Sequence, residues 1–90
     1  AMEWDVAALA REVYVSPDYL RQLFRAEYGE PVIHYLIHRR VEYAKALLRE
    51  TGDSVSEIAQ ASGFHDPYYF SRVFKKQVGS SPSEYRAGRE

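Results

Sequence analysis

Residues 55–79 read VSEIAQASGFHDPYYFSRVFKKQVG, and residues 6–29 read VAALAREVYVSPDYLRQLFRAEYG. Both stretches have the same order: an apolar segment, a short break, a polar residue followed by proline, an amphipathic segment and a glycine. Equivalent residues lie 49 apart before the break and 50 apart after it, so the second break contains one extra residue. Because a solenoid needs at least three copies, two copies indicate a duplicated unit inside one domain.

Each copy is predicted to form a short helix, a tight turn and a longer helix. Apolar residues recur at helical spacing in both longer segments. They are Leu20, Leu23, Phe24 and Tyr28 in the first copy and Phe70, Val73, Phe74 and Val78 in the second. The pairs Ser16-Pro17 and Asp66-Pro67 predict where these helices begin, because a capping oxygen satisfies a free N–H and proline at the first position loses no hydrogen bond.

The residues that predict the remaining helix ends are also close to those ends in the sequence. Gly29 and Gly79 predict the stops of the two longer helices, where a left-handed residue is tolerated. Ser54 and Glu57 form a predicted capping box for the short helix of the second copy.

A third helix is predicted between the copies, over residues 31–51. Its apolar stripe comprises Ile33, Leu36, Ile37, Val41, Ala44, Leu47 and Leu48. At 1.5 Å per residue, its residues 32–49 would span roughly 27 Å. The predicted core includes Phe24, Phe74, Tyr35, Tyr85, Leu47 and Leu48. Since no segment alternates with period two, the prediction is an all-α fold without a sheet.

Composition excludes several classes of protein. A hydrophobic fraction of 46% and a charged fraction of 28% are those of an ordinary globular domain. The chain has no cysteine, which excludes disulfides and cysteine-based zinc sites and agrees with a cytoplasmic location. No apolar run reaches the roughly 20 residues of a membrane span, and no signal peptide opens the chain. Ala1-Met2 is typical of an expression remnant, so we expect the natural protein to extend further toward its N-terminus.

The net charge of −1 is weak evidence about partners, because the charge is segregated along the chain. Residues 31–49 and residues 67–79 each carry +3, whereas residues 50–66 carry −4. Such segregation can build a basic face on a chain that is nearly neutral overall.

A short helix, a tight turn and a second helix make a helix-turn-helix unit, whose second helix enters the major groove of DNA. We predict one domain over residues 1–90, with a first unit at 5–30, the connecting helix at 31–51 and a second unit with a closing helix at 54–86. Such a homeodomain-like pair, held apart by nearly 30 Å, approaches one DNA turn of about 34 Å. One chain would then occupy two adjacent major grooves on double-stranded DNA. Because the copies differ, the target would not be palindromic.

The second copy, from Ile58-Ala59 through residues 63–76 to Gly79, Pro82 and Tyr85-Arg86, closely resembles the signature of the AraC/XylS family. The first copy and residues 40–48 resemble the rest of that family's DNA-binding domain, so the resemblance covers nearly the whole chain. It implies a bacterial transcription regulator, usually an activator, that contacts promoter DNA and often RNA polymerase. It also implies that a small-molecule effector would act through an N-terminal domain absent from this chain.

Two features depart from the family pattern. Tyr14 occupies a turn position where the family commonly has glycine, as Gly63 does in the second copy. If that position needs φ > 0, tyrosine is strained there and the turn is reshaped. The family also often has one more helix before the first copy, and without it some core around Trp4 is expected to be exposed.

In the first unit, the candidate contacts are Arg21 and Gln22, which lie off the apolar row. Arginine pairs with guanine and glutamine with adenine, although both residues also suit a solvated helix face. Asp18 matches a DNA-contacting position of the family and could accept from cytosine N4, or instead favour the helix dipole. Arg25 is expected to contact phosphate, and Ser16 is a further candidate for such a contact.

In the second unit, Tyr68, Ser71 and Arg72 occupy the corresponding outward positions. Arg72 either contacts a base or pairs internally with Asp66, and Tyr68 could contact a thymine methyl. Lys75 and Lys76 are expected to contact phosphate.

Two arginines of the connecting helix are further candidates. Either Arg39 or Arg40 could touch phosphate, while Arg40 could equally brace the two halves. The eight tyrosines do not suggest single-strand stacking, because most fall on apolar stripes.

Other functions find little support in the sequence. His34, His38 and Glu42 share a helix face that can ligate zinc, but the His-Glu-x-x-His motif is absent and no metal or other cofactor is predicted. There is no phosphate loop or nucleophile elbow, so an enzyme is not expected. The main alternative is a helical protein-interaction module that kept the fold and lost DNA binding. The sequence does not distinguish an activator from a repressor.

Overall fold

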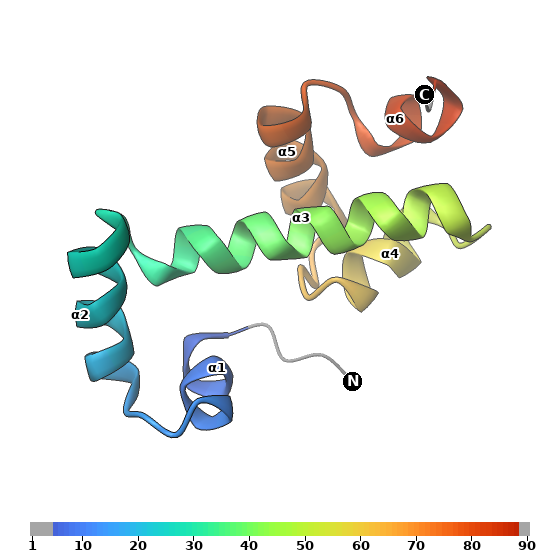
Figure 1. The fold of residues 1–90 in the computed structure, drawn as a ribbon. Coiled ribbons are helices and arrows are strands. Elements are labelled where there is room, and N and C mark those ends of the chain that lie inside the picture. Colours follow the sequence, from blue (N-terminus) through green and yellow to red (C-terminus); the bar gives the residue numbers. More distant parts are fainter. Residues whose placement is uncertain (1–4, 89–90) are drawn as a thin grey trace. The chain divides into compact units, whose positions relative to one another are not determined.

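The computed structural model describes residues 5–88, which form helices and no strand (Figure 1). The helices are α1 (Val6–Glu12), α2 (Pro17–Tyr28), α3 (Val32–Glu50), α4 (Val55–Ala61), α5 (Pro67–Val78) and α6 (Pro82–Gly88). The all-α prediction is confirmed, and the longer helices begin at the two prolines as expected. Trp4 lies outside the described residues. None of the helices in the described part combines the length and apolarity needed to cross a membrane.

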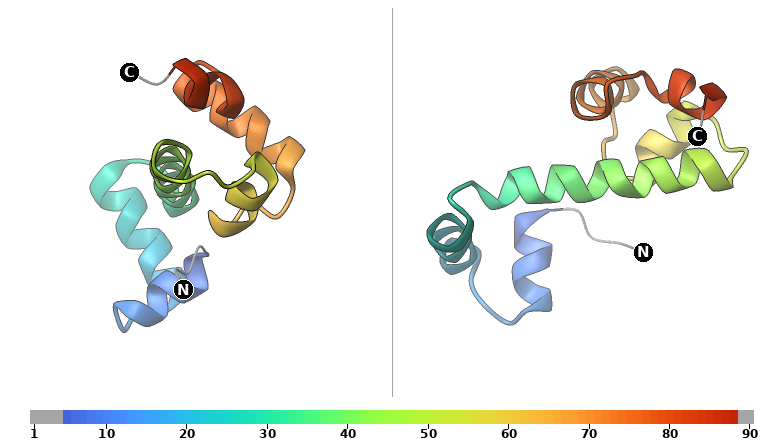
Figure 2. Two further views of the ribbon diagram at one scale, coloured as in Figure 1. Left: turned by 90° about the vertical axis from the view of Figure 1, so that its right-hand side faces the viewer. Right: turned by 45° about the horizontal axis from the view of Figure 1, so that its top comes forward.

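The chain divides into two compact units, and the division falls inside α3. The first unit ends at Arg39 and the second begins at Arg40. In the first unit α1 packs against α2, and in the second α4 packs against α5, which also contacts α6 (Figure 2). Each unit therefore contains a short helix followed by a longer one, as the repeat predicts, and each uses a part of α3.

Each unit has its own hydrophobic core. The first consists of Val6, Ala10, Leu20, Val32 and Leu36, with Leu9, Val15 and Phe24 packed against it. The second consists of Val41, Ala44, Leu48, Ile58, Ala59, Phe64, Phe70 and Phe74, with Leu47, Val55, Val73, Val78 and Tyr85 packed against it. Phe70 and Phe74 are fully buried, whereas Phe24 is only half-buried, so the second core is larger and contains more aromatic side chains.

The predicted core assignment of Tyr35 is wrong, and Ile33 of the predicted apolar stripe is not buried either. Tyr35 is 38% exposed and Ile33 is 39% exposed. The row of α3 that is buried in the first unit is Val32 and Leu36, one helical turn apart, and Ile33 and Tyr35 flank it on either side. The apolar stripe is therefore wider than the surface that α1 and α2 cover.

The predicted caps of the longer helices are present. Ser16 Oγ accepts a hydrogen bond from the Tyr19 N–H at 3.1 Å, and Asp66 Oδ1 accepts one from the Tyr68 N–H at 2.9 Å. Gly29 ends α2 with φ 76° and Gly79 ends α5 with φ 100°, both left-handed. The boundaries of α2 and α5 thus follow from local chemistry.

Both shorter helices of the second unit begin with a capping box. The box predicted for α4 is confirmed, since Glu57 Oε1 accepts from the Ser54 N–H at 2.8 Å and Ser54 Oγ accepts from the Glu57 N–H at 3.0 Å. Ser81 and Glu84 form the same pair of bonds at the start of α6, at 2.8 and 3.1 Å. The hydrogen bonds of Ser81 and the charge of Lys75 hold the pKa of Glu84 below its ordinary value.

Polar contacts of long sequence separation anchor α6 to the C-terminal end of α3. Arg86 donates to the backbone oxygens of Leu48 and Thr51 at 3.1 and 3.2 Å. Arg49 donates to Tyr85 Oη at 2.6 Å, and the Tyr85 ring lies 5.6 Å from that of Phe74. These bonds satisfy carbonyls at the end of α3 and fix α6 within the second unit.

Candidate nucleic-acid interface

The outward face of α2 carries the four polar side chains predicted for the first unit: Asp18, Arg21, Gln22 and Arg25. Their spacing of three, four and seven residues places them on one face of the helix. All four residues are exposed, whereas Leu20 is buried in the core and Phe24 is half-buried. The amphipathic pattern thus leaves α2 with a free polar face, which is what a helix needs to enter a DNA groove.

Asp18 and Arg21 form an ion pair on this face. Arg21 Nη1 lies 3.1 Å from Asp18 Oδ1, and the two side chains are 55% and 92% exposed, respectively. An exposed pair of this kind contributes little to folding stability. Its effect is local: the carboxylate holds the guanidinium near the first turn of α2 and places a negative charge beside it.

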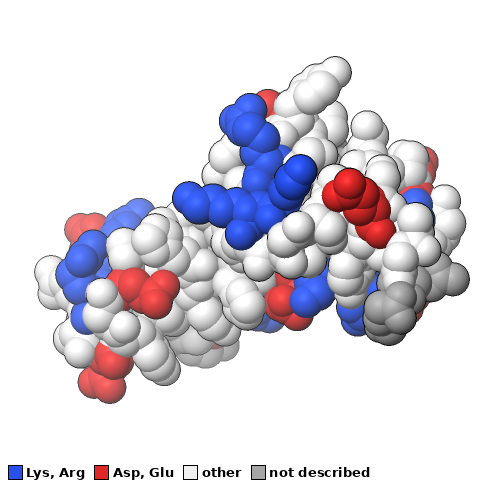
Figure 3. Space-filling model, turned by 90° about the horizontal axis from the view of Figure 1, so that it is seen from above, with Lys and Arg blue, Asp and Glu red and all other residues white. Residues whose placement is uncertain are grey.

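The outward face of α5 repeats this spacing with different chemistry. Tyr68, Arg72 and Lys75 are exposed and Ser71 is half-buried, while Lys76 lies next to this row. Tyr68, the second residue of α5, is 80% exposed. Figure 3 shows Lys and Arg side chains gathered at this helix, and α5 itself contributes three cations and no acid.

Arg72 is not held by the acid that caps its helix. Asp66 is engaged with the Tyr68 N–H, and among residues 5–88 no ion pair joins it to Arg72. The Arg72 side chain is therefore available on the exposed face, in contrast to the paired Arg21.

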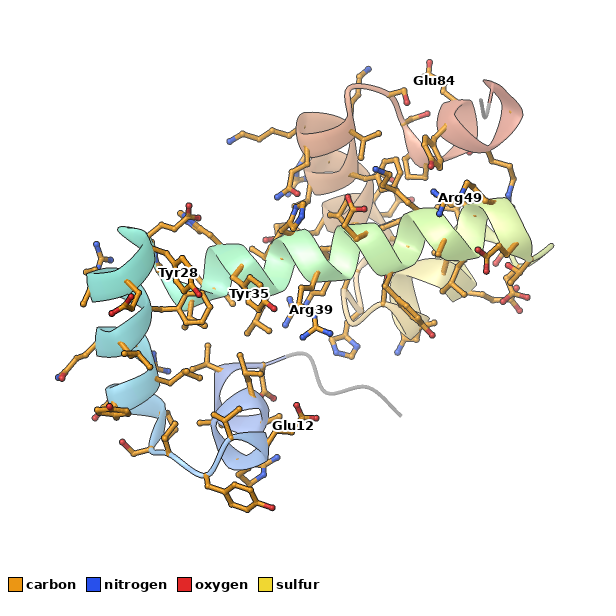
Figure 4. The ribbon with its side chains drawn as sticks, in the orientation of Figure 1. Glu12, Tyr28, Tyr35, Arg39, Arg49 and Glu84 are labelled. Atoms are coloured by element: carbon orange, nitrogen blue, oxygen red, sulfur yellow. The ribbon has the colours of Figure 1, made fainter. Side chains whose placement is uncertain are left out.

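The two arginines of α3 lie over aromatic rings, each within its own unit. The guanidinium carbon of Arg39 is 5.8 Å from the centre of the Tyr35 ring, and Figure 4 labels both residues. The guanidinium carbon of Arg40 is 5.9 Å from the centre of the Phe64 ring, and Arg40 is half-buried. Because Arg40 packs on a core residue of the second unit, its environment favours a structural role, while Arg39 remains exposed.

Most tyrosines are exposed, contrary to the expectation that they lie on buried stripes. Tyr14, Tyr19, Tyr28, Tyr35, Tyr68 and Tyr69 are 38% to 94% exposed. Tyr28 and Tyr35, both labelled in Figure 4, flank Phe24 with ring centres 4.9 and 5.1 Å from it. Spacing alone therefore did not exclude single-strand stacking, and the argument for duplex DNA rests on the helix-turn-helix geometry.

The turns that precede the two longer helices share their backbone conformation. The N–H groups of Tyr14 and Val15 donate to the carbonyls of Arg11 and Ala10 at 3.2 and 3.0 Å. Gly63 and Phe64 make the equivalent bonds to Gln60 and Ala59 at 3.1 and 2.9 Å. Tyr14 has φ 62° and Gly63 has φ 88°, so tyrosine does adopt the strained conformation and the first turn is not reshaped.

The extra residue of the second turn is His65, which was not singled out from the sequence. It also has a positive φ, 63°, and lies directly before the cap Asp66. The change of repeat offset from 49 to 50 predicted one extra residue in this turn but not which residue it is.

The histidines of α3 do not form a metal cluster in the described part of the chain. His34 Nδ1 instead lies 3.7 Å from Glu30 Oε1, one helical turn earlier.

Comparison with known proteins identifies the family of this fold. A model of a helix-turn-helix domain matches residues 9–88. A transcriptional regulator from Chromobacterium violaceum with an AraC-type DNA-binding domain superposes with a TM-score of 0.82 at 30% identity, over 94% of this chain and 76% of that one. The chain belongs to the AraC family. The AraC-family domain is a non-enzymatic DNA-binding domain of transcription regulators.

Two further relatives carry more specific descriptions. The arabinose operon regulatory protein of Salmonella typhimurium is 44% identical over 87 residues, which is 97% of this AraC-family chain but 31% of that relative. The DNA-binding domain of AdpA, solved in complex with a target DNA, has a TM-score of 0.80 at 37% identity, over 96% of this chain and 78% of that one. The chain thus spans less than a third of the length of that curated relative.

Proposed function

We propose that this domain binds double-stranded DNA sequence-specifically, with α2 and α5 each entering a major groove. The observation that carries the proposal is the repeated outward row at equal spacing on the two helices, exposed except for the half-buried Ser71. Each row is backed by buried or half-buried aromatic and aliphatic residues. The relative AdpA, whose domain was solved with target DNA, supports the same role.

We divide the candidate side chains into those proposed to contact bases and those proposed to contact phosphates. Arg21 and Gln22 on α2, and Arg72 with Tyr68 and Ser71 on α5, are proposed to contact base edges. Arg25, Lys75 and Lys76 are proposed to contact phosphate, with Ser16 and Arg39 as further candidates. Asp18 orients Arg21, and Arg40 supports the second core.

The target is proposed to be non-palindromic and to span adjacent grooves. The two rows differ at each corresponding position: Arg21 corresponds to Ser71, Gln22 to Arg72, and Arg25 to Lys75. Their half-sites must therefore differ. A helix of the length of α3, 19 residues, measures roughly 28 Å, near the 34 Å or so of one DNA turn.

The parent protein is proposed to be a bacterial transcription regulator, usually an activator in relatives of this kind. Contact with RNA polymerase and response to a small-molecule effector belong to that longer protein. A helical protein-interaction module without DNA binding is the competing hypothesis.

Selection of binding sites from random duplexes with this chain tests the proposal. We expect one asymmetric site with two unlike half-sites. Arg21→Ala should relax the preference at one or two base pairs of one half-site, at a cost of about 1–3 kcal/mol, and Arg72→Ala should do so in the other. Equal losses on selected and scrambled duplexes would contradict base contacts, and no salt-dependent binding at 50 mM salt would favour the interaction module.

A further inference from the structure

Tyr14 combines a strained backbone with a side chain that the fold does not use. Its φ of 62° lies in the left-handed region, which costs a residue with a Cβ more than it costs glycine. Tyr14 is also 94% exposed to solvent. The structural function of the turn resides in backbone hydrogen bonds, and Gly63 makes the same bonds in the second unit.

The first unit therefore keeps a tyrosine where glycine would serve the fold better. No ring contact, hydrogen bond of the hydroxyl or core packing of Tyr14 offsets the strain within residues 5–88. Strained residues of this kind concentrate at functional sites, where a side chain is needed in a particular place.

The position of Tyr14 in the unit indicates what the side chain would meet. It lies in the turn between α1 and α2, two residues before the cap Ser16. In a docked helix-turn-helix, the N-terminal residues of the second helix meet base edges while the first helix crosses the sugar-phosphate backbone. The turn that joins them then lies at the edge of the groove, beside the phosphates. Tyrosine hydroxyls are among the groups that contact phosphate oxygens.

We propose that Tyr14 Oη donates a hydrogen bond to a DNA phosphate at the edge of the first half-site. Tyr14 is then a positioning contact that the second unit, with Gly63, lacks. The inference rests on the proposed DNA binding and adds to it an uncharged contact that distinguishes the two units.

Tyr14→Phe and Tyr14→Gly test this contact in fluorescence anisotropy titrations with a selected duplex and a scrambled one. Loss of one such hydrogen bond should weaken binding about five-fold in both variants, by a similar factor on both duplexes. The salt dependence should not change, because a neutral hydroxyl releases no counterion. Tyr28→Phe is the matched control, since Tyr28 is 69% exposed at the opposite end of α2, and it should bind as the unchanged chain does.

The thermal stability of Tyr14→Gly provides a second readout. Its Tm should rise while its affinity falls, because glycine relieves the strain and removes the hydroxyl. The inference is overturned if the unchanged chain binds DNA and Tyr14→Phe binds equally well, or if only the selected duplex is affected, which would indicate a base contact. Failure of the unchanged chain to bind any duplex would instead refute the proposed function.

Discussion

At the scale of single residues, the ion pair between Asp18 and Arg21 affects the proposed contact of α2 with DNA. In the proposed complex, the Arg21 guanidinium would exchange this carboxylate for a base or a phosphate. Because Asp18 is 92% exposed, it also repels any phosphate that approaches without a compensating contact. If Arg21 contacts guanine as proposed, the pair should favour a duplex that supplies guanine at that position over one that supplies only backbone charge.

Replacing Asp18 by Asn should raise affinity for scrambled DNA about three-fold at low salt and narrow the ratio between selected and scrambled duplexes. The reason is that the repulsion and the competition for Arg21 are both removed. Anisotropy titrations at 50 mM salt measure this ratio. Glu27→Gln is the matched control, since it makes the same charge change on the opposite side of α2; equal effects of the two variants would show that only bulk charge matters.

Helical spacing predicted the outward rows on α2 and α5 because a period of 3.6 residues decides which positions share a face. The same spacing explains why only one of the two arginines is paired. Asp18 lies three residues before Arg21, a pairing distance on a helix, whereas Asp66 lies six residues before Arg72 and accepts from the Tyr68 N–H. The contacts of these side chains with DNA stay a prediction.

At the scale of elements, helix ends in this chain are specified locally. The caps at Ser16, Ser54 and Asp66 and the stops at Gly29 and Gly79 could be predicted because each involves residues within one helical turn. The anchoring of α6 could not, since the partners of Arg86 and Tyr85 are more than 30 residues away and depend on the fold.

Because of the capping box of α6, the thermal stability of the second unit should depend measurably on pH in the acid range. The pKa of Glu84 is lowered on folding, so ionised Glu84 stabilises the fold above its ordinary pKa, and this contribution is lost as pH falls through the lowered value. The Tm difference between the unchanged chain and Glu84→Gln should therefore shrink between pH 6 and about 3. A difference that stays constant over this range would show that the carboxylate charge is not involved.

Arg86→Met should destabilise the second unit by about 1–3 kcal/mol, because two carbonyls at the end of α3 lose charged donors. Denaturant unfolding followed by circular dichroism measures the change. Tyr85→Phe, which removes only the acceptor of the exposed Arg49 bond, should cost less than Arg86→Met. If the two variants were equally destabilised, the carbonyl contacts would not be what anchors α6.

At the scale of the whole molecule, the net charge of −1 is the sum of helices that differ in charge. The helix α2 carries two acids and two bases, whereas α5 carries three bases and no acid. The duplication was visible in the sequence because the order of caps, prolines and glycines repeats. The division of the chain inside α3 was not, since it depends on which core each residue of that helix joins.

The salt dependence of DNA binding should reflect this difference in charge between α2 and α5. Lys75→Ala and Lys76→Ala together should reduce the slope of log affinity against log salt by about two, since each removes one proposed phosphate contact. Lys45→Ala should leave the slope unchanged, because Lys45 lies 3.3 Å from Glu42 and over the Tyr85 ring. A slope that is insensitive to the double variant would remove both lysines from the backbone contacts.

The division within α3 determines how a hybrid regulator could be assembled from two relatives. A crossover at the loop after Glu50 would separate Val41, Ala44 and Leu48 from the aromatic residues they pack on. A crossover between Arg39 and Arg40 leaves both clusters whole, provided that no residue is inserted or deleted and the helical register is preserved. New combinations of half-site preference should therefore be recovered from recombination in the middle of a helix, and not at the boundary between two helices.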